Sequence, residues 1–198
     1  LIPWDAVHLF WGDERCVPPD HADSNYGMAN ETLFRPLKIS TTQVFRMSGE
    51  ATDHDAAAHQ YEEVLRKQVC PNNSPWPLFD LILLGLGEDA HTASLFPGTP
   101  ALDEARRLVV ANRAPQGITH RITLTAPAIN QARTILFLVG GSGKAQAVKT
   151  VLHDRTVDTR QAPAKLIQAV AGRLIWMLDR AAASALPVSQ QDLTYHEE

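Results

Sequence analysis

Asp89 and His91, near the middle of the chain, have the types and spacing of an acid–base pair. A histidine titrates near neutral pH and can take a proton from water, and a nearby carboxylate can fix its tautomer and raise its basicity. Both residues lie in GLGEDAHTASLFPG (85–98), directly after the apolar run FDLILLG (79–85). The alternative explanation is a capping aspartate and a structural histidine on a turn.

A second polar cluster follows the apolar run VHLFW (7–11) and contains Asp13, Glu14 and Arg15. The planar guanidinium of an arginine matches a phosphate or carboxylate better than a point charge does. If the preceding strand is buried, Asp13 and Arg15 are expected to face a cleft. A charge triplet of this kind can equally be solvated surface or a salt bridge at a helix terminus.

The third cluster is the glycine-rich turn from Gly140 to Lys144. It is not a P-loop, which would need a glycine in place of Leu138 and a hydroxyl residue in place of Ala145. Lys144 also breaks the G-x-S-x-G pattern of a nucleophile elbow. A glycine turn that opens a helix, with a lysine in its first turn, can bind an anion through backbone N–H groups and the helix dipole. A flexible turn with an exposed lysine is the other interpretation.

Gly85, Gly87 and Ala90 also fit the G-x-G-x-x-A form of a dinucleotide-binding turn. Pro97 and Gly98 interrupt the long helix that should follow such a turn, and no acidic residue stands where a ribose contact is needed. We therefore disfavour nicotinamide binding.

The three clusters need a scaffold that ends several strands near one another. Hydrophobic periodicity predicts strands at the segments AVHLFW, FDLILLG, HRITLT, TILFLVG and RLIWML, and helices at DHDAAAHQYEEVLRKQV and KAQAVKTVL. The strand FDLILLG reads as buried on both faces, and GDER and GGSGK read as turns. Alternating strands and helices predict an α/β fold with a mostly parallel, open sheet and helices on both faces. Such sheets place ligands at the carboxyl ends of their strands.

Composition limits the class of protein. The chain has 198 residues, 44% of them hydrophobic, and a formal net charge of -4, which argues against sequence-independent nucleic-acid binding. Cys16 and Cys70 form no metal-ligand pattern, which favours a reducing, cytoplasmic environment. No stretch is long enough for a membrane span. We expect one domain over residues 1–198, no metal, and a monomer or homodimer.

Taken together, WGDERCVPPDHADSNYGMANETLF, FDLILLGLGEDAHTASLFPG, RITLTAPAINQA and LVGGSGKAQAV resemble the 6-phosphogluconolactonase family, in order and at family-like separations. The resemblance implies hydrolysis of 6-phospho-D-glucono-1,5-lactone in the oxidative pentose phosphate pathway, without a cofactor. It also implies the Rossmann-like α/β fold of glucosamine-6-phosphate deaminases and ribose-5-phosphate isomerases. By this resemblance His91 is the active-site histidine, Asp89 is its acidic neighbour, and Lys144 binds the substrate phosphate.

The chain departs from the family at its start. Members usually begin with an additional strand and helix that carry a glycine-rich SGGSTP-type phosphate loop, and we expect this chain, read from Leu1, to lack that segment. The related deaminases have a glutamate five residues after the histidine, where this chain has Phe96, and tend to have an aromatic residue in place of Arg15. Both differences favour a lactonase.

The expected mechanism follows from the chemistry of an activated ester. His91 removes a proton from the attacking water, and Asp89 or Asp13 orients its imidazole. Arg15 and Lys144 hold the phosphate, and backbone N–H groups of the Gly85–Gly87 turn face the developing oxyanion. The alternatives are an isomerase or deaminase of the same fold and a non-catalytic sugar-phosphate binding domain.

Overall fold

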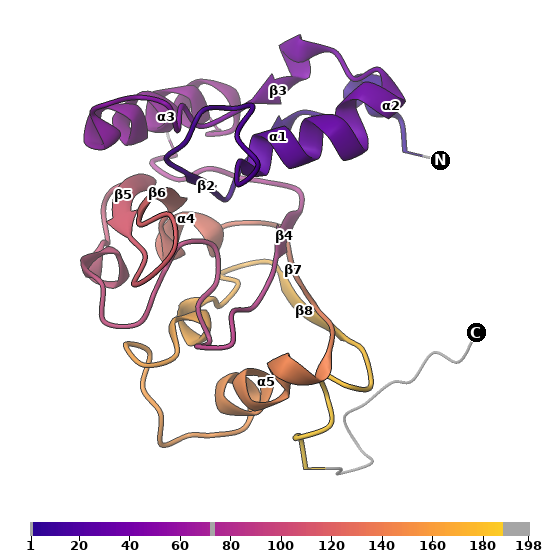
Figure 1. The fold of residues 1–198 in the computed structure, drawn as a ribbon, viewed down its shortest axis with the longest axis vertical. Helices are drawn as coiled ribbons and strands as arrows, with labels where there is room; N and C mark the ends of the chain where they lie inside the picture. Colours follow the sequence, from indigo (N-terminus) through magenta and orange to yellow (C-terminus); the bar gives the residue numbers. More distant parts are fainter. Residues whose placement is uncertain (1, 72–73, 188–198) are drawn as a thin grey trace.

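The computed structural model describes residues 2–71 and 74–187, and its path is shown in Figure 1. The strands are β1 (Leu9–Phe10), β2 (Asp13–Arg15), β3 (Val44–Phe45), β4 (Ile82–Leu84), β5 (Val109–Arg113), β6 (His120–Leu124), β7 (Thr134–Val139) and β8 (Arg173–Leu178). The α-helices are α1 (Asn25–Ala29), α2 (Arg35–Leu37), α3 (His54–Gln68), α4 (Ala126–Ile129) and α5 (Ala145–Leu152). Short helical turns are η1 (Trp4–Ala6), η2 (Asn30–Phe34), η3 (Thr41–Gln43), η4 (Pro100–Asp103), η5 (Ser142–Lys144) and η6 (Pro163–Leu166).

The strands form three sheets. β4, β7 and β8 pair in parallel, in the order β4-β7-β8, and β1 pairs in parallel with β3. The third sheet, in the order β2-β6-β5, is antiparallel. The predicted α/β class with parallel strands is therefore confirmed, and the antiparallel sheet is an addition that the sequence did not predict.

All five predicted strand segments contain a strand, and both predicted helices are present as α3 and α5. The prediction of a turn at GDER is wrong, because Asp13, Glu14 and Arg15 form β2. These residues pair with Thr123, Ile122 and Arg121 of β6. The prediction of a glycine turn opening a helix is confirmed at Gly141, whose φ of 91° precedes η5 and α5.

Helix α3 forms because its sequence supplies both a start signal and an apolar stripe. The Asp53 side chain accepts a hydrogen bond from the N–H of Ala56 and caps the first turn. Ala57, Ala58, Tyr61 and Leu65 recur at helical spacing and are buried. The Tyr61 hydroxyl accepts a 2.8 Å hydrogen bond from the N–H of Trp11, which connects α3 to the segment between β1 and β2.

The β4-β7-β8 sheet has one buried and one exposed face. Ile135 and Phe137 of β7 are fully buried, and the Phe137 ring stacks on Trp176 with centroids 3.9 Å apart. On the opposite face, Leu83, Leu138 and Met177 are 58%, 50% and 55% exposed. We call these three residues the apolar face. The prediction that the FDLILLG strand is buried on both faces is therefore wrong for the part of the chain that the structure describes.

The parallel arrangement places two of the predicted polar clusters at one edge. β4 and β7 are neighbours that run in the same direction, so the segments that follow them leave the same end of the sheet. Glu88 and Asp89 follow β4, and Lys144 follows β7. No helix in residues 2–71 and 74–187 is long and apolar enough to cross a membrane.

Candidate active site

The turn after β4 holds Asp89 and His91 as a hydrogen-bonded pair. Nδ1 of His91 lies 2.5 Å from Oδ1 of Asp89, and the same oxygen accepts from the His91 backbone N–H at 3.2 Å. The turn is closed by the Gly87 N–H, which donates to the carbonyl of His91 at 2.8 Å. Because Asp89 occupies Nδ1, Nε2 is the imidazole nitrogen left for proton transfer.

The Asp89–His91 pair packs directly against Gly87, where a side chain would not fit. A Cβ placed on Gly87 would lie 2.1 Å from Nδ1 of His91 and 2.6 Å from Oδ1 of Asp89. Both contacts are far inside van der Waals distance, so a side chain at position 87 is incompatible with the observed pair. The role of Gly87 is therefore steric. Its N–H donates to the carbonyl of His91 within the turn, and the contact of that N–H with a substrate oxyanion stays a prediction.

The imidazole of His91 packs on an aromatic ring. The centroid of the Phe96 ring lies 4.5 Å from that of His91, at an interplanar angle of 44°. The side chain of His91 keeps 30% of its surface exposed. The ring is thus restrained on one side by Asp89 and on another by Phe96, and remains open to a ligand.

Asp13 lies in the same cavity with different partners. Its Oδ2 accepts a 2.6 Å hydrogen bond from the Ser94 hydroxyl, and its backbone carbonyl accepts from the Asn25 amide at 2.9 Å. Of the two carboxylates that could orient His91, only Asp89 is hydrogen-bonded to the imidazole among the described residues, whereas Asp13 is bonded to Ser94.

The backbone at Arg15 is held in place by the neighbouring Glu14, whose side chain is only 2% exposed. The Glu14 carboxylate accepts hydrogen bonds from the backbone N–H groups of Arg15, Asn25 and Tyr26, each at 2.8 Å, and from the Ser24 hydroxyl. The guanidinium of Arg15 donates from Nη1 to the carbonyl of Asp23 at 2.7 Å. Glu14 thereby joins β2 to the start of α1 and presents its neighbours, residues 13 and 15, to the cavity.

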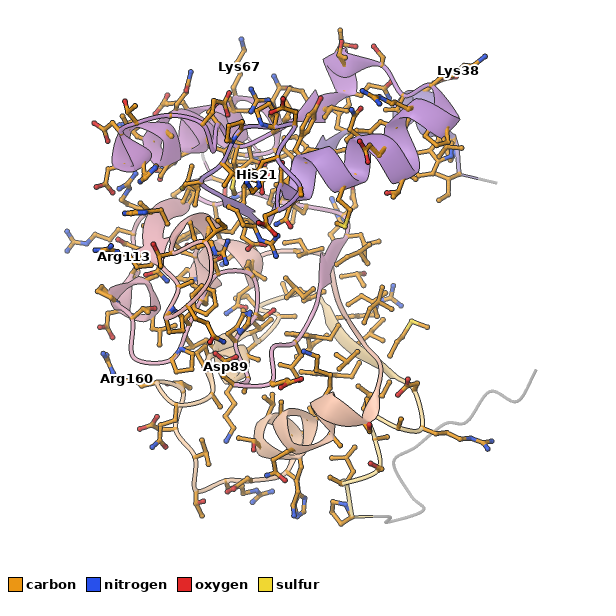
Figure 2. The ribbon with its side chains drawn as sticks, viewed as in Figure 1. His21, Lys38, Lys67, Asp89, Arg113 and Arg160 are labelled. Carbon is orange, nitrogen blue, oxygen red and sulfur yellow. The ribbon has the colours of Figure 1, made fainter. Side chains whose placement is uncertain are left out.

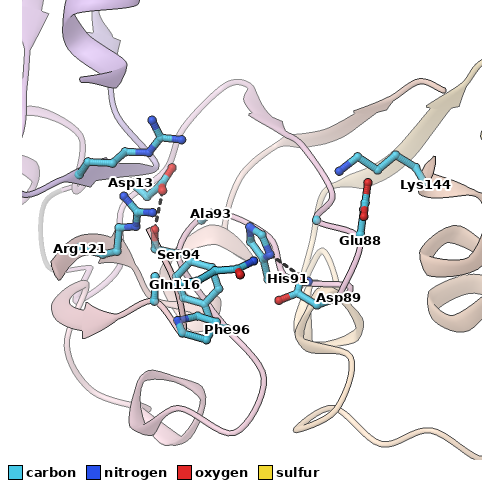
Figure 3. Close-up of a pocket in the computed structure, with 14 residues that line it drawn as sticks. Asp13, Glu88, Asp89, His91, Ala93, Ser94, Phe96, Gln116, Arg121 and Lys144 are labelled. Carbon is cyan, nitrogen blue, oxygen red and sulfur yellow. Dashed lines mark hydrogen bonds and ion pairs between the residues drawn. The ribbon is translucent and has the colours of Figure 1, made fainter. Parts of the chain in front are cut away.

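Lys144 reaches the cavity from the end of η5. Figure 3 shows its side chain beside Glu88, with His91 between this pair and the side chains of Asp13 and Arg121. Glu88 packs closely on the glycine turn, since a Cβ on Gly143 would lie 3.0 Å from its Oε1. The site therefore has cationic groups on both sides of the histidine.

The predicted site residues converge. A cavity of about 400 Å³ is lined by Asp13, Arg15, Gly87, Asp89, His91 and Lys144, among others. An adjoining cavity of about 330 Å³ shares five of these residues and adds Gly85. Three clusters that lie far apart in the sequence, from Asp13 to Lys144, thus form one concave site of a size that suits a sugar phosphate.

Sequence reasoning missed several lining residues, namely Glu88, Ser94, Gln116 and Arg121. Arg121 carried a weak signal as an arginine in the predicted strand HRITLT, which also contains a histidine and two threonines. Ser94 becomes important only through its contact with Asp13, which sequence spacing cannot reveal.

Two other kinds of chemistry receive no support from the described residues. Among them there is no group of three His, Cys, Asp or Glu side chains that could hold a metal ion. Burial raises the pKa of the Cys16 thiol to about 11, so this thiol stays protonated at neutral pH and is a poor nucleophile.

Comparison with known proteins places the chain in a family. Residues 1–176 match the family model described as glucosamine-6-phosphate isomerases/6-phosphogluconolactonase. The chain is 43% identical over 186 residues to the 6-phosphogluconolactonase of a Synechocystis strain. The aligned region covers 93% of this chain and 75% of the relative.

Solved structures agree. The crystal structure of a protein named devB superposes with a TM-score of 0.84 at 38% identity, covering 94% of this chain and 76% of that one. The 6-phosphogluconolactonase of Trypanosoma brucei superposes with a TM-score of 0.77 at 33% identity, covering 92% and 75%. From the three convergent clusters, the mixed α/β fold and these matches, we conclude that the chain belongs to the glucosamine-6-phosphate isomerase/6-phosphogluconolactonase family.

Proposed function

We propose that the chain hydrolyses 6-phospho-D-glucono-1,5-lactone to 6-phospho-D-gluconate in the oxidative pentose phosphate pathway. The observation that carries the proposal is the Asp89–His91 pair inside a cavity that has cationic side chains on both sides of the histidine. A lactone with a distal phosphate needs both a base for water and a cationic site for the phosphate. The names of the relatives support the same substrate.

In the proposed mechanism, Nε2 of His91 takes a proton from water as the water oxygen attacks C1 of the lactone. The imidazolium then returns the proton to the ring oxygen as the bond from C1 to that oxygen breaks. Asp89 accepts the Nδ1–H hydrogen bond, which fixes the tautomer and stabilises the imidazolium. Asp13, held by Ser94, lines the cavity beside the reacting groups.

In this proposal the phosphate binds Arg15 and Lys144. Both side chains line the two adjoining cavities. Gly85 remains a proposed backbone contact for the substrate, since it lines the second cavity. The reaction as proposed uses no cofactor. The proposal also includes a Rossmann-like single domain over residues 1–198, a cytoplasmic location and a monomer or homodimer.

A deaminase or isomerase of the same family is the catalytic alternative. Phe96 bears against it, because this side chain packs on His91 and supplies no carboxylate for opening a sugar ring. A non-catalytic sugar-phosphate binding domain is the second alternative. It would need the cationic groups but not the hydrogen-bonded Asp89–His91 pair.

The test is the decay of freshly generated 6-phosphogluconolactone, followed with excess 6-phosphogluconate dehydrogenase as the reporter and compared with spontaneous hydrolysis. We expect acceleration by the unchanged chain and a fall in kcat/KM of about 10²- to 10⁴-fold in His91→Ala, the usual range for loss of a general base. The exposed His59→Ala serves as the matched control. A fall of only a few-fold in His91→Ala would remove this residue from the base role, and binding without turnover would support a binding domain.

A further inference from the structure

Arg121 lies on β6 in a position that the proposed mechanism does not use. It is the register partner of Arg15 across the β2–β6 pair, so the two side chains leave the same face of the sheet. Arg121 also lines the cavity that contains His91. In Figure 3 its guanidinium lies beside the Asp13–Ser94 contact, on the side of His91 away from Lys144.

Two nitrogen atoms of the Arg121 guanidinium lack acceptors. Its Nε and Nη1 atoms are shielded from solvent and have no hydrogen-bond partner among residues 2–71 and 74–187. Arg15, by contrast, has the carbonyl of Asp23 as an acceptor. A buried donor without an acceptor destabilises the fold, and a charged donor does so more strongly.

The pairing of the two arginines adds to this cost. Like charges directly opposite one another on antiparallel strands are destabilising. Burial, and after it the neighbouring charge of Arg15, lowers the pKa of Arg121. Asp13 offsets this effect in part. An anion in the cavity would supply acceptors and neutralise both arginines at once.

We propose that Arg121 binds the phosphate group of the sugar-phosphate substrate together with Arg15. The assignment rests on the proposed function and deepens it, because it adds a second guanidinium to the phosphate site. Two adjacent guanidinium groups suit the several oxygens and double charge of a phosphate ester better than they suit a single carboxylate.

The first experiment measures binding without turnover. Calorimetry compares glucose 6-phosphate, which has a phosphate and no carboxylate, with gluconate, which has a carboxylate and no phosphate. We expect Arg121→Gln to weaken binding of glucose 6-phosphate by about 10- to 100-fold, the loss typical of hydrogen bonds to a charged group. Arg113→Gln, an exposed arginine on the neighbouring strand, is the matched control and should bind as the unchanged chain does.

The second experiment separates substrate binding from a structural role. The thermal midpoint of Arg121→Gln without ligand should equal or exceed that of the unchanged chain, because the variant removes an unsatisfied buried cation and a like-charge pair. A fall in the midpoint would assign Arg121 to the fold. Arg121→Lys keeps the charge without the planar guanidinium and should bind glucose 6-phosphate with intermediate affinity.

The third experiment uses kinetics. Arg121→Gln should raise KM for the phosphorylated lactone and leave kcat/KM for unphosphorylated glucono-1,5-lactone unchanged. Equal losses on both lactones would place Arg121 at the reacting carbonyl and overturn the assignment, as would unchanged binding of glucose 6-phosphate or preferential loss of gluconate binding. If the unchanged chain binds glucose 6-phosphate but hydrolyses no lactone, the proposed function fails while the phosphate site stands.

Discussion

At the scale of single residues, the Asp89–His91 pair depends on the absence of a side chain at position 87. A Cβ there would lie 2.1 Å from Nδ1 of His91. We expect Gly87→Ala to displace the imidazole and lower kcat/KM roughly 10²-fold, as misplacement of a catalytic group by about 1 Å does. The measurement is the coupled lactonase assay.

Gly12→Ala is the control for this glycine substitution. A Cβ on Gly12 meets no atom within 4 Å, so the variant tests the general effect of replacing glycine near the site. Equal activity of Gly87→Ala and Gly12→Ala would contradict the steric role. A crystal structure of Gly87→Ala should show the Asp89–His91 hydrogen bond broken.

Lys144 provides a second test at this scale. If it holds the substrate phosphate, Lys144→Ala should raise KM severalfold or more and leave kcat nearly unchanged, because the contact is made equally in the ground state and the transition state. Steady-state kinetics over a range of substrate concentrations measure both constants. An unchanged KM would remove Lys144 from the phosphate site.

The sequence pointed to the proposed reacting residues more directly than to the side chains that support them. Short motifs made Asp89, His91 and Lys144 candidates, and the family resemblance gave them their predicted roles; all three line one cavity. Ser94 and Arg121 act through contacts across the fold, and the register of one strand against another is not encoded in either segment alone. The turn uses the Gly87 N–H as a donor to the carbonyl of His91, a bond that sequence spacing did not reveal.

At the scale of elements, Glu14 connects β2 to α1. Its buried carboxylate accepts four hydrogen bonds, three of them from groups at the start of α1. Glu14→Gln turns one acceptor oxygen into a donor that faces other donors. We expect a loss of about 2–3 kcal/mol in the free energy of unfolding, the range for a broken buried network.

Urea unfolding followed by circular dichroism measures this loss, with the exposed Glu31→Gln as control. Because β2 carries Asp13 and Arg15, Glu14→Gln should also raise KM. Stability equal to that of Glu31→Gln would contradict the connecting role.

Elements with a strong local pattern were predicted well. Helix α3 and the strands β4, β6, β7 and β8 lie in segments with a recognisable pattern of apolar residues, and each was located from the sequence. β2 was taken for a turn because Asp13, Glu14 and Arg15 are charged and poor in β propensity. It is a strand because its backbone pairs with β6, a nonlocal cause that no short window contains.

At the scale of the whole molecule, the apolar face of Leu83, Leu138 and Met177 exposes large hydrophobic side chains on one side of a sheet. Leu138 and Met177 are register partners on β7 and β8, so their exposed side chains lie side by side. Surfaces of this kind promote association. We expect the 198-residue chain to self-associate with rising concentration and to bind a hydrophobic dye.

Replacing Leu138 by lysine together with Met177 by glutamate should reduce both effects, since the pair would place opposite charges next to one another on this face. Sedimentation velocity measures the association. The control is Leu152→Lys, which changes an apolar side chain, 43% exposed, at the end of α5. Equal association of the double variant and the unchanged chain would contradict this expectation.

The cavity also lies between residues of two different sheets, β2-β6-β5 and β4-β7-β8. Figure 2 shows the side chains of the described residues, with Asp89 and Arg113 on different parts of the ribbon. Arg15 and Arg121 belong to the antiparallel sheet, and Lys144 follows a strand of the β4-β7-β8 sheet.

A bound sugar phosphate would therefore act as a noncovalent crosslink between two sheets. At about 100 times its Kd, such a ligand adds about 2.7 kcal/mol to the free energy of unfolding. That energy is lost if either sheet opens, so ligand should slow amide hydrogen exchange in both sheets together. Occupancy of the site thus makes the unfolding of the two sheets more cooperative.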